Sequence, residues 1–202
     1  MSLKTKVKVG NITNLSDARY CAGMGAAWLG FPMKDAEGLL FSPEKFTDIT
    51  GWVSGPEFVL EAEETNLKEL YKIIDNYPAH YLQLDASQIE DFDPTHIERL
   101  IVSIDIHEWQ KWKNIISESK ALITHLLITN SSEGNPKDLH SLIGEMAEYG
   151  TLILGFGIIK ETLTEILELP IVGIALNGSH EERPGMKDYD QLADILEALD
   201  TD

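Results

Sequence analysis

One pattern repeats along the chain of 202 residues: a short apolar run rich in β-branched residues is followed by a longer stretch with helical spacing. The predicted strands cover 6–10, 26–31, 57–61, 80–84, 100–104, 122–128, 151–154 and 171–175. The predicted helices cover 17–25, a segment that begins at Pro43, 65–77, 93–99, 108–119, 136–149, 160–168 and 189–199. Eight such units without a long insertion favour a closed barrel of parallel strands over an open doubly wound sheet. We therefore predict an α/β fold, a (β/α)8 TIM barrel in which residues 1–202 form a single domain.

Composition narrows the class of protein and the range of partners. The net charge of −18 argues against nucleic acid and against an anionic membrane surface, because both bind basic patches. No run approaches the roughly 20 apolar residues of a membrane span, and the first residues have no apolar signal region. The one cysteine, Cys21, excludes an internal disulfide and a cysteine-based zinc site. We expect a cytoplasmic protein, a monomer or a homodimer, with no cofactor.

Two neighbouring strand-to-loop junctions near the end of the chain are rich in glycine and small polar residues. Gly155-Phe156-Gly157 follows the seventh predicted strand, and Asn177-Gly178-Ser179 follows the eighth. In a (β/α)8 barrel these two junctions lie side by side, where their backbone N–H groups can hold a phosphate. The pattern predicts a phosphate-binding site for a small phosphorylated metabolite.

Several motifs, taken in order, resemble the phosphoribosylanthranilate isomerase family of tryptophan biosynthesis. The residues that carry the resemblance are Lys8-Val9-Gly10-Asn11-Ile12-Thr13, Asp17-Ala18, Gly25-Ala26-Ala27-Trp28-Leu29-Gly30-Phe31, Gly173-Ile174-Ala175 and Pro184-Gly185-Met186-Lys187-Asp188. The motifs match well around the first two and the last two predicted strands. In the middle of the chain only the order of strands and helices matches. The resemblance implies a TIM barrel that catalyses an Amadori rearrangement of N-(5-phosphoribosyl)anthranilate.

The resemblance also locates the family's catalytic groups, and this chain departs from the family there. The family's base is a cysteine at the end of the first strand, where this chain has Gly10. Its acid is an aspartate at the end of the sixth strand, where this chain has Thr129, and the aspartate of the eighth strand becomes Ala175. Each proton-transfer group contributes about 10²–10⁴-fold to the rate, so other groups would have to supply the chemistry.

A group of acidic residues suggests where such chemistry could lie. Glu61, Asp85 and Asp105 end the third, fourth and fifth predicted strands, and these ends meet at the barrel mouth, where barrel enzymes have their active sites. Carboxylates in one place repel each other and favour a cation, a shared proton or a basic ligand. The alternative is a set of solvated loop acids. We take these three residues as candidate catalytic groups and assign no metal site.

Three functions remain open from the sequence. The first is an isomerase of the resembling family, and the second is a barrel that binds a phosphorylated metabolite, with new chemistry at the acidic group or with none. The third is a scaffold without a small-molecule ligand. Fold alone does not choose between them, because barrels host many chemistries.

Overall fold

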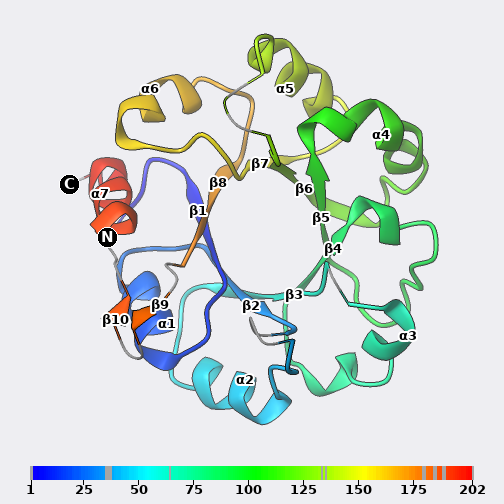
Figure 1. Ribbon diagram of the computed structural model, residues 1–202, viewed down its shortest axis with the longest axis vertical. Coiled ribbons are helices and arrows are strands. Elements are labelled where there is room, and N and C mark those ends of the chain that lie inside the picture. The colour runs from blue at the N-terminus through cyan, green and yellow to red at the C-terminus, as the bar shows by residue number, and fades with distance from the viewer. Residues whose placement is uncertain are drawn as a thin grey trace.

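The computed structural model describes residues 2–34, 38–63, 65–132, 134, 136–178, 181–183, 186–187 and 190–201. Eight parallel strands form a closed barrel in sequence order, and β8 pairs with β1 to complete it (Figure 1). The strands are β1 Lys6–Gly10, β2 Trp28–Pro32, β3 Glu57–Glu61, β4 Tyr81–Asp85, β5 Leu100–Asp105, β6 Ile123–Thr129, β7 Leu152–Leu154 and β8 Gly173–Asn177. The predicted barrel is therefore confirmed, and each predicted strand overlaps the corresponding observed one.

Helices surround the barrel as a ring (Figure 1). The α-helices are α1 Leu15–Gly23, α2 Pro43–Thr50, α3 Leu67–Leu70, α4 Trp109–Glu118, α5 Leu139–Ala147, α6 Leu163–Ile166 and α7 Asp190–Leu199. Short 3₁₀ turns lie at η1 Ile74–Asn76, η2 Ala86–Gln88, η3 Ile106–Glu108 and η4 Lys160–Thr162. A small antiparallel pair, β9 Glu181–Arg183 with β10 Met186–Lys187, follows β8. No helix among the described residues is long and apolar enough to cross a membrane.

Side-chain caps fix where two of the helices begin. The Asn14 side chain accepts a hydrogen bond from the N–H of Asp17 at the start of α1, at 2.9 Å. The Ser42 side chain does the same for Lys45 at the start of α2, and Pro43 occupies the first helical position, where no N–H is needed.

Two predicted helices are wrong in part or in whole. The segment 65–77 is not one helix, because it divides into α3 and η1 with a turn between them. The segment 93–99 forms turns instead of a helix. There the Asp93 side chain accepts a hydrogen bond from the N–H of Thr95, and Pro94 lies between them, so a local turn replaces the helical hydrogen bonds.

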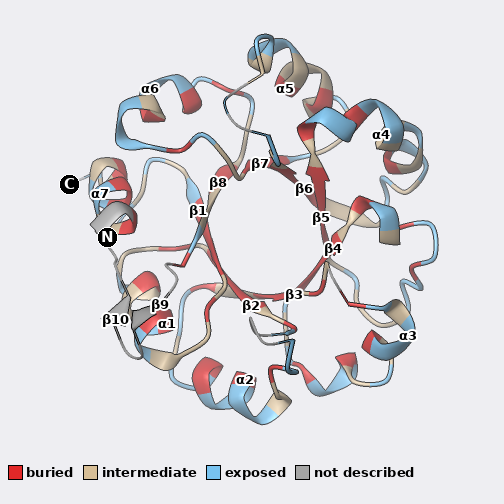
Figure 2. Cartoon of the chain, in the orientation of Figure 1, coloured by how far each residue is buried: buried red, intermediate tan, exposed pale blue. Residues whose placement is uncertain are grey.

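Most of the barrel strands are buried along their length (Figure 2). Alternate residues of each strand face opposite sides, so the barrel has two apolar layers. In β1, Val7 and Val9 are buried in the outer layer beneath the helices. The inner layer is a separate apolar cluster inside the barrel, made of Trp28, Val59, Tyr81, Ile101, Leu127 and Ile153. Cys21, in α1, is buried in the outer layer, as expected of a structural cysteine.

Candidate functional site

The carboxylate of Glu61 lies at the C-terminal end of the barrel, close to the backbone of β1 and β2. Both strands have a glycine at the position that the carboxylate approaches. A methyl group added at Gly30, on β2, would overlap this carboxylate, and one added at Gly10, on β1, would lie 2.7 Å from Glu61 Oε1. Two polar groups of β1 and the turn after it hold the carboxylate. The ammonium of Lys8 forms an ion pair with Oε1, and the N–H of Asn11 donates to Oε2 at 3.0 Å.

Backbone conformation and burial both keep Glu61 in place. Asn11 has a φ of 56°, a left-handed conformation that asparagine tolerates better than most residues, and its N–H points at the carboxylate. The side chain of Lys8 is 3% exposed and that of Glu61 is 12% exposed. Removing one partner of such a buried ion pair leaves an uncompensated charge, which costs about 3–5 kcal/mol.

The space above Gly10 connects this ion pair with the end of β8. The three heavy atoms nearest to a side-chain carbon placed at Gly10 are Glu61 Oε1 at 2.7 Å, Asn177 Oδ1 at 3.3 Å and Lys8 Nζ at 3.3 Å. Position 10 is where the resemblance placed the missing catalytic thiol. A carboxylate and an ammonium therefore stand around the place where that side chain would begin.

A cavity of about 460 Å³ opens beside Glu61, over the ends of β2, β3 and β4. Its lining residues are Pro32, Met33, Lys34, Glu61, Glu63, Thr65 and Asp85. Burial raises the pKa of the Glu63 carboxyl, and the charge of Glu61 raises it further, while Gln83, Lys8 and Ser103 act in the opposite direction. Glu63 thus adds a second carboxyl group beside the ion pair.

The structure places the three predicted acidic residues in different surroundings. Glu61 and Asp85 both line the cavity of about 460 Å³, whereas Asp105 is not among its lining residues. Asp85 is the N-cap of η2, and its side chain accepts hydrogen bonds from the N–H and the hydroxyl of Ser87. Both oxygens of Asp105 are engaged by backbone: Oδ1 accepts from His107 N–H at 2.8 Å and Oδ2 from Ser131 N–H at 2.7 Å. Among the described residues, no group of acidic, histidine or cysteine side chains has the arrangement of a metal site.

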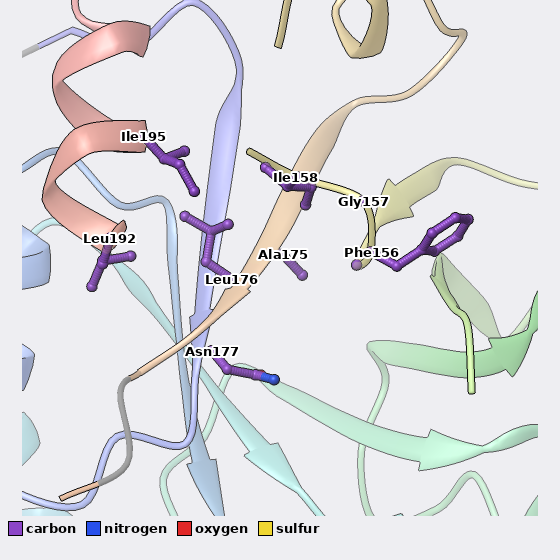
Figure 3. Close-up of a pocket in the computed structure, with 9 residues that line it drawn as sticks. Phe156, Gly157, Ile158, Ala175, Leu176, Asn177, Leu192 and Ile195 are labelled. Carbon is purple, nitrogen blue, oxygen red and sulfur yellow. The ribbon is translucent and has the colours of Figure 1, made fainter. Parts of the chain in front are cut away.

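A second cavity, of about 240 Å³, opens at the ends of β7 and β8, and the predicted phosphate-site residues Gly155, Phe156, Gly157 and Asn177 line it, whereas Gly178 does not. Its lining residues are Gly155, Phe156, Gly157, Ile158, Ala175, Leu176, Asn177, Leu192 and Ile195. Figure 3 shows the ring of Phe156 directed away from Leu192 and Ile195, so it does not fill the space between them. Ala175 gives this wall a methyl group where the family has a carboxylate.

Backbone N–H groups at this second cavity differ in whether they are already engaged. Gly155 N–H donates to the carbonyl of Ile128, and Gly178 N–H donates to the carbonyl of Gly10, both at 2.8 Å. Within the described part of the chain, the N–H groups of 156–158 have no acceptor, so they remain for a ligand. Gly157, with a φ of 67°, makes the turn that presents them. Ser179 lies outside the described residues.

Sequence reasoning missed three polar groups that interact with Glu61 or Glu63, namely Lys8, Gln83 and Ser103. Lys8 reads as an ordinary charged residue in an alternating strand, and only closure of the barrel turns its side chain inward. Gln83 and Ser103 lie at inward positions of β4 and β5, and both are buried. The alternation of faces along a strand could have found Gln83, because residues two apart face the same side and Gln83 lies two residues before Asp85. In the structure Gln83 pairs in register with Glu61.

Comparisons with known proteins agree with the resemblance seen in the sequence. No family model matches the chain. The N-(5′-phosphoribosyl)anthranilate isomerase of Thermotoga maritima is 26% identical over 200 residues, which are 93% of this chain and 94% of that protein. The protein of the same name from Thermotoga petrophila is 25% identical over 95% of this chain and 96% of its own length.

Solved structures extend the comparison to the fold. A phosphoribosylanthranilate isomerase in complex with reduced 1-(o-carboxyphenylamino)-1-deoxyribulose 5-phosphate has a TM-score of 0.71 at 17% identity, covering 96% of this chain and 98% of that one. The enzyme from Thermus thermophilus has a TM-score of 0.68 at 22% identity, with the same coverage of both chains. Over nearly its whole length, this chain is similar in sequence and in fold to the phosphoribosylanthranilate isomerases.

Proposed function

We propose that this barrel is a phosphoribosylanthranilate isomerase-like enzyme that performs an Amadori rearrangement on a phosphorylated aldosylamine, with Glu61 in place of the missing thiol. The observation that carries the proposal is the position of the Glu61 carboxylate, 2.7 Å from the point where a side chain at Gly10 would begin. The relatives named for this reaction cover nearly the whole chain, so the same strands would present the substrate.

The phosphate would bind at the cavity beside β7 and β8. The N–H groups of 156–158 face no acceptor among the described residues and can donate to phosphate oxygens. The Asn177 side chain, which lines the same cavity, reaches the space above Gly10. A substrate anchored there by its phosphate would extend its sugar toward Lys8 and Glu61.

The ion pair has the groups that the rearrangement needs. The ammonium of Lys8 gives a proton to the ring oxygen, which opens the ring and leaves an iminium at C1. The carboxylate of Glu61 removes the proton from C2, and the electron pair forms the C1–C2 double bond of an enaminol. Glu61 then returns its proton to C1, and the C2 hydroxyl returns one to Lys8, which yields the ketose. No oxidant or reductant is required.

The test is turnover of freshly made phosphoribosylanthranilate, followed by the loss of its fluorescence with the protein in excess. We expect isomerisation above the rate without protein, and we expect Glu61→Gln to remove it. Glu118→Gln, an exposed carboxylate on α4, is the matched control and should retain the wild-type rate. Wild-type protein that binds phosphate esters without any turnover of this compound or of other aldosylamine phosphates would contradict the proposal.

A second candidate is a barrel that binds a phosphorylated metabolite without isomerising it. The observation in its favour is Thr129 at the end of β6, because a hydroxyl there cannot act as the acid that the family places at this strand. Stabilisation of the fold by phosphate esters, together with no turnover, would favour this reading.

A further inference from the structure

The cavity beside Glu61 is lined by hydrogen-bond acceptors. Glu61, Glu63 and Asp85 all contribute carboxyl groups to its wall. Lys8 forms an ion pair with Glu61, but within the part of the chain that the structure describes neither Glu63 nor Asp85 forms an ion pair. The one cationic residue in the lining, Lys34, is exposed and has its ammonium 3.9 Å from Glu69, which is outside the lining.

A buried side-chain acceptor next to these carboxyl groups is also without a partner. Gln83 is 3% exposed, and its Oε1 has no hydrogen-bond partner among the described residues. Its side chain points into the barrel on β4, two residues before Asp85 and in register with Glu61, and it interacts with Glu63. A buried acceptor without a partner costs about 1–3 kcal/mol, and an N–H donor supplied by a ligand would remove this cost.

The raised pKa of Glu63 also favours a cation in this cavity. Burial and the neighbouring charge of Glu61 disfavour its ionised form. A cation in the cavity would offset both effects, whereas a carboxylate in the cavity would add to them. The wall therefore favours a positively charged group that has N–H donors and no acceptor.

The lining of this cavity and the lining of the one beside β7 and β8 each have a side chain that reaches the space above Gly10. Glu61 lines the first cavity and Asn177 lines the second. A side-chain oxygen of each lies within 3.3 Å of the position that a side-chain carbon at Gly10 would occupy. One ligand can therefore extend from the phosphate loops, across the ion pair, into the acceptor-lined cavity.

We propose that the amine substituent of the substrate carries an ammonium or amidinium group, bound by Glu63, Asp85 and Gln83, where the relatives' named substrate carries a carboxylate. This inference rests on the proposed function, because the phosphate end and the sugar position are taken from it. It makes the enzyme selective for a cationic aldosylamine phosphate over anthranilate-type compounds.

The test compares three adducts of ribose 5-phosphate that differ in one group. They are formed with 3-aminobenzamidine, which carries a cation with N–H donors, with 3-aminobenzoate, which carries a carboxylate, and with aniline, which carries neither. Calorimetric titration of wild-type protein should give tighter binding of the amidinium adduct than of the benzoate adduct, by about tenfold or more, the difference expected of a partly desolvated charge pair. The aniline adduct should lie between them.

Two variants show whether the named residues set this preference. Glu63→Gln and Asp85→Asn should each reduce the amidinium-to-benzoate ratio several-fold, while Glu118→Gln keeps the wild-type ratio. The ratio compares two dissociation constants measured on one preparation, so partial unfolding of a variant cannot imitate the effect. An unchanged ratio in both variants would overturn the assignment of these residues.

The outcomes separate this inference from the proposed function. Equal binding of the three adducts, or a preference for the benzoate adduct, would overturn the inference and leave the isomerase proposal standing. Binding of free 3-aminobenzamidine as tight as that of its adduct would overturn the phosphate anchor, and so the proposed function, while supporting the cationic cavity. Binding of none of these compounds would overturn both.

Discussion

The two ends of the barrel interior differ in the size of their side chains: large rings fill the N-terminal end, and glycine and alanine line the C-terminal end. At the N-terminal end, Trp28, Tyr81 and His125 bring large rings together, with Trp28 and His125 at a centroid distance of 5.2 Å. Arg99 closes this end by hydrogen-bonding both oxygens of Glu57, at 2.5 Å and 3.3 Å, and lies over the ring of Tyr81. We call these five residues the lower plug.

The C-terminal end has small residues at the corresponding inward positions. Gly10, Gly30, Gly155 and Ala175 leave space there, and two cavities open in that space. The polar groups that enter it, such as the Lys8–Glu61 pair, are buried but not covered by large rings. The lower plug therefore serves stability, while the upper end gives up packing for access to a ligand, which is the division expected of a (β/α)8 barrel.

The largest expected effect at the upper end comes from Glu61→Gln. Loss of the base should lower turnover of the accepted aldosylamine by about 10²–10⁴-fold. It also leaves the buried Lys8 without its ion-pair partner, so the free energy of unfolding should fall by up to about 3–5 kcal/mol. Initial rates and denaturant titrations check the two parts. A stable variant with wild-type rates would remove Glu61 from the chemistry.

A substitution in the lower plug should lower stability and leave turnover unchanged. Trp28 is 1% exposed, and Trp28→Ala should lower the free energy of unfolding by about 3–5 kcal/mol through the cavity it leaves. Below its melting temperature, the variant should keep the turnover rate of the wild type, because no group near Gly10 changes. A fall in rate as large as that of Glu61→Gln would show that the two ends are not separate.

Acid should weaken the lower plug through His125. Burial lowers the pKa of His125 to about 4, and the charges of Lys6 and Arg99 add to this effect, while Glu57 opposes it. The unfolded chain, with a histidine pKa near 6.5, then binds the extra proton, so stability is lost as the pH falls from about 6.5 to about 4. The loss should be about 3 kcal/mol.

The measurement is the free energy of unfolding as a function of pH, compared with His125→Phe. This variant has no titrating group at position 125 and should show a flatter curve in that window. Carboxyl groups with lowered pKa, such as those of Glu57 and Asp105, add their losses mainly below that window. An identical slope in wild type and variant between pH 6.5 and 4.5 would contradict the assignment.

The smallest effect is expected of Asp105→Asn. The carboxylate holds the turns after β5 and β6 by accepting from the N–H groups of His107 and Ser131. The asparagine amide keeps one oxygen acceptor, but its NH₂ group cannot accept the second backbone N–H. The free energy of unfolding should therefore fall by about 1 kcal/mol. Turnover should change by less than about tenfold if this structural role is the main one. A larger loss would support the catalytic role that the sequence suggested for Asp105.

The fold could be predicted from the sequence because the strands depend on local patterns. Glu61 could be located as well, since it ends an apolar strand. The role of Lys8 could not, because an alternating strand does not say which of its faces is enclosed until eight strands close on each other. The helix predicted at 93–99 failed for a local reason, since the side chain of Asp93 competes for the backbone N–H of Thr95.

The central claim is that the Glu61 carboxylate removes the C2 proton of a phosphorylated aldosylamine. Proton NMR in deuterated water can follow the C2 proton signal of the adduct that binds tightest, with protein in excess and the rate without protein subtracted. We predict that wild-type protein and Glu118→Gln remove the signal at the same rate, and that Glu61→Gln leaves it unchanged. Loss of the signal with Glu61→Gln at the wild-type rate would contradict the claim.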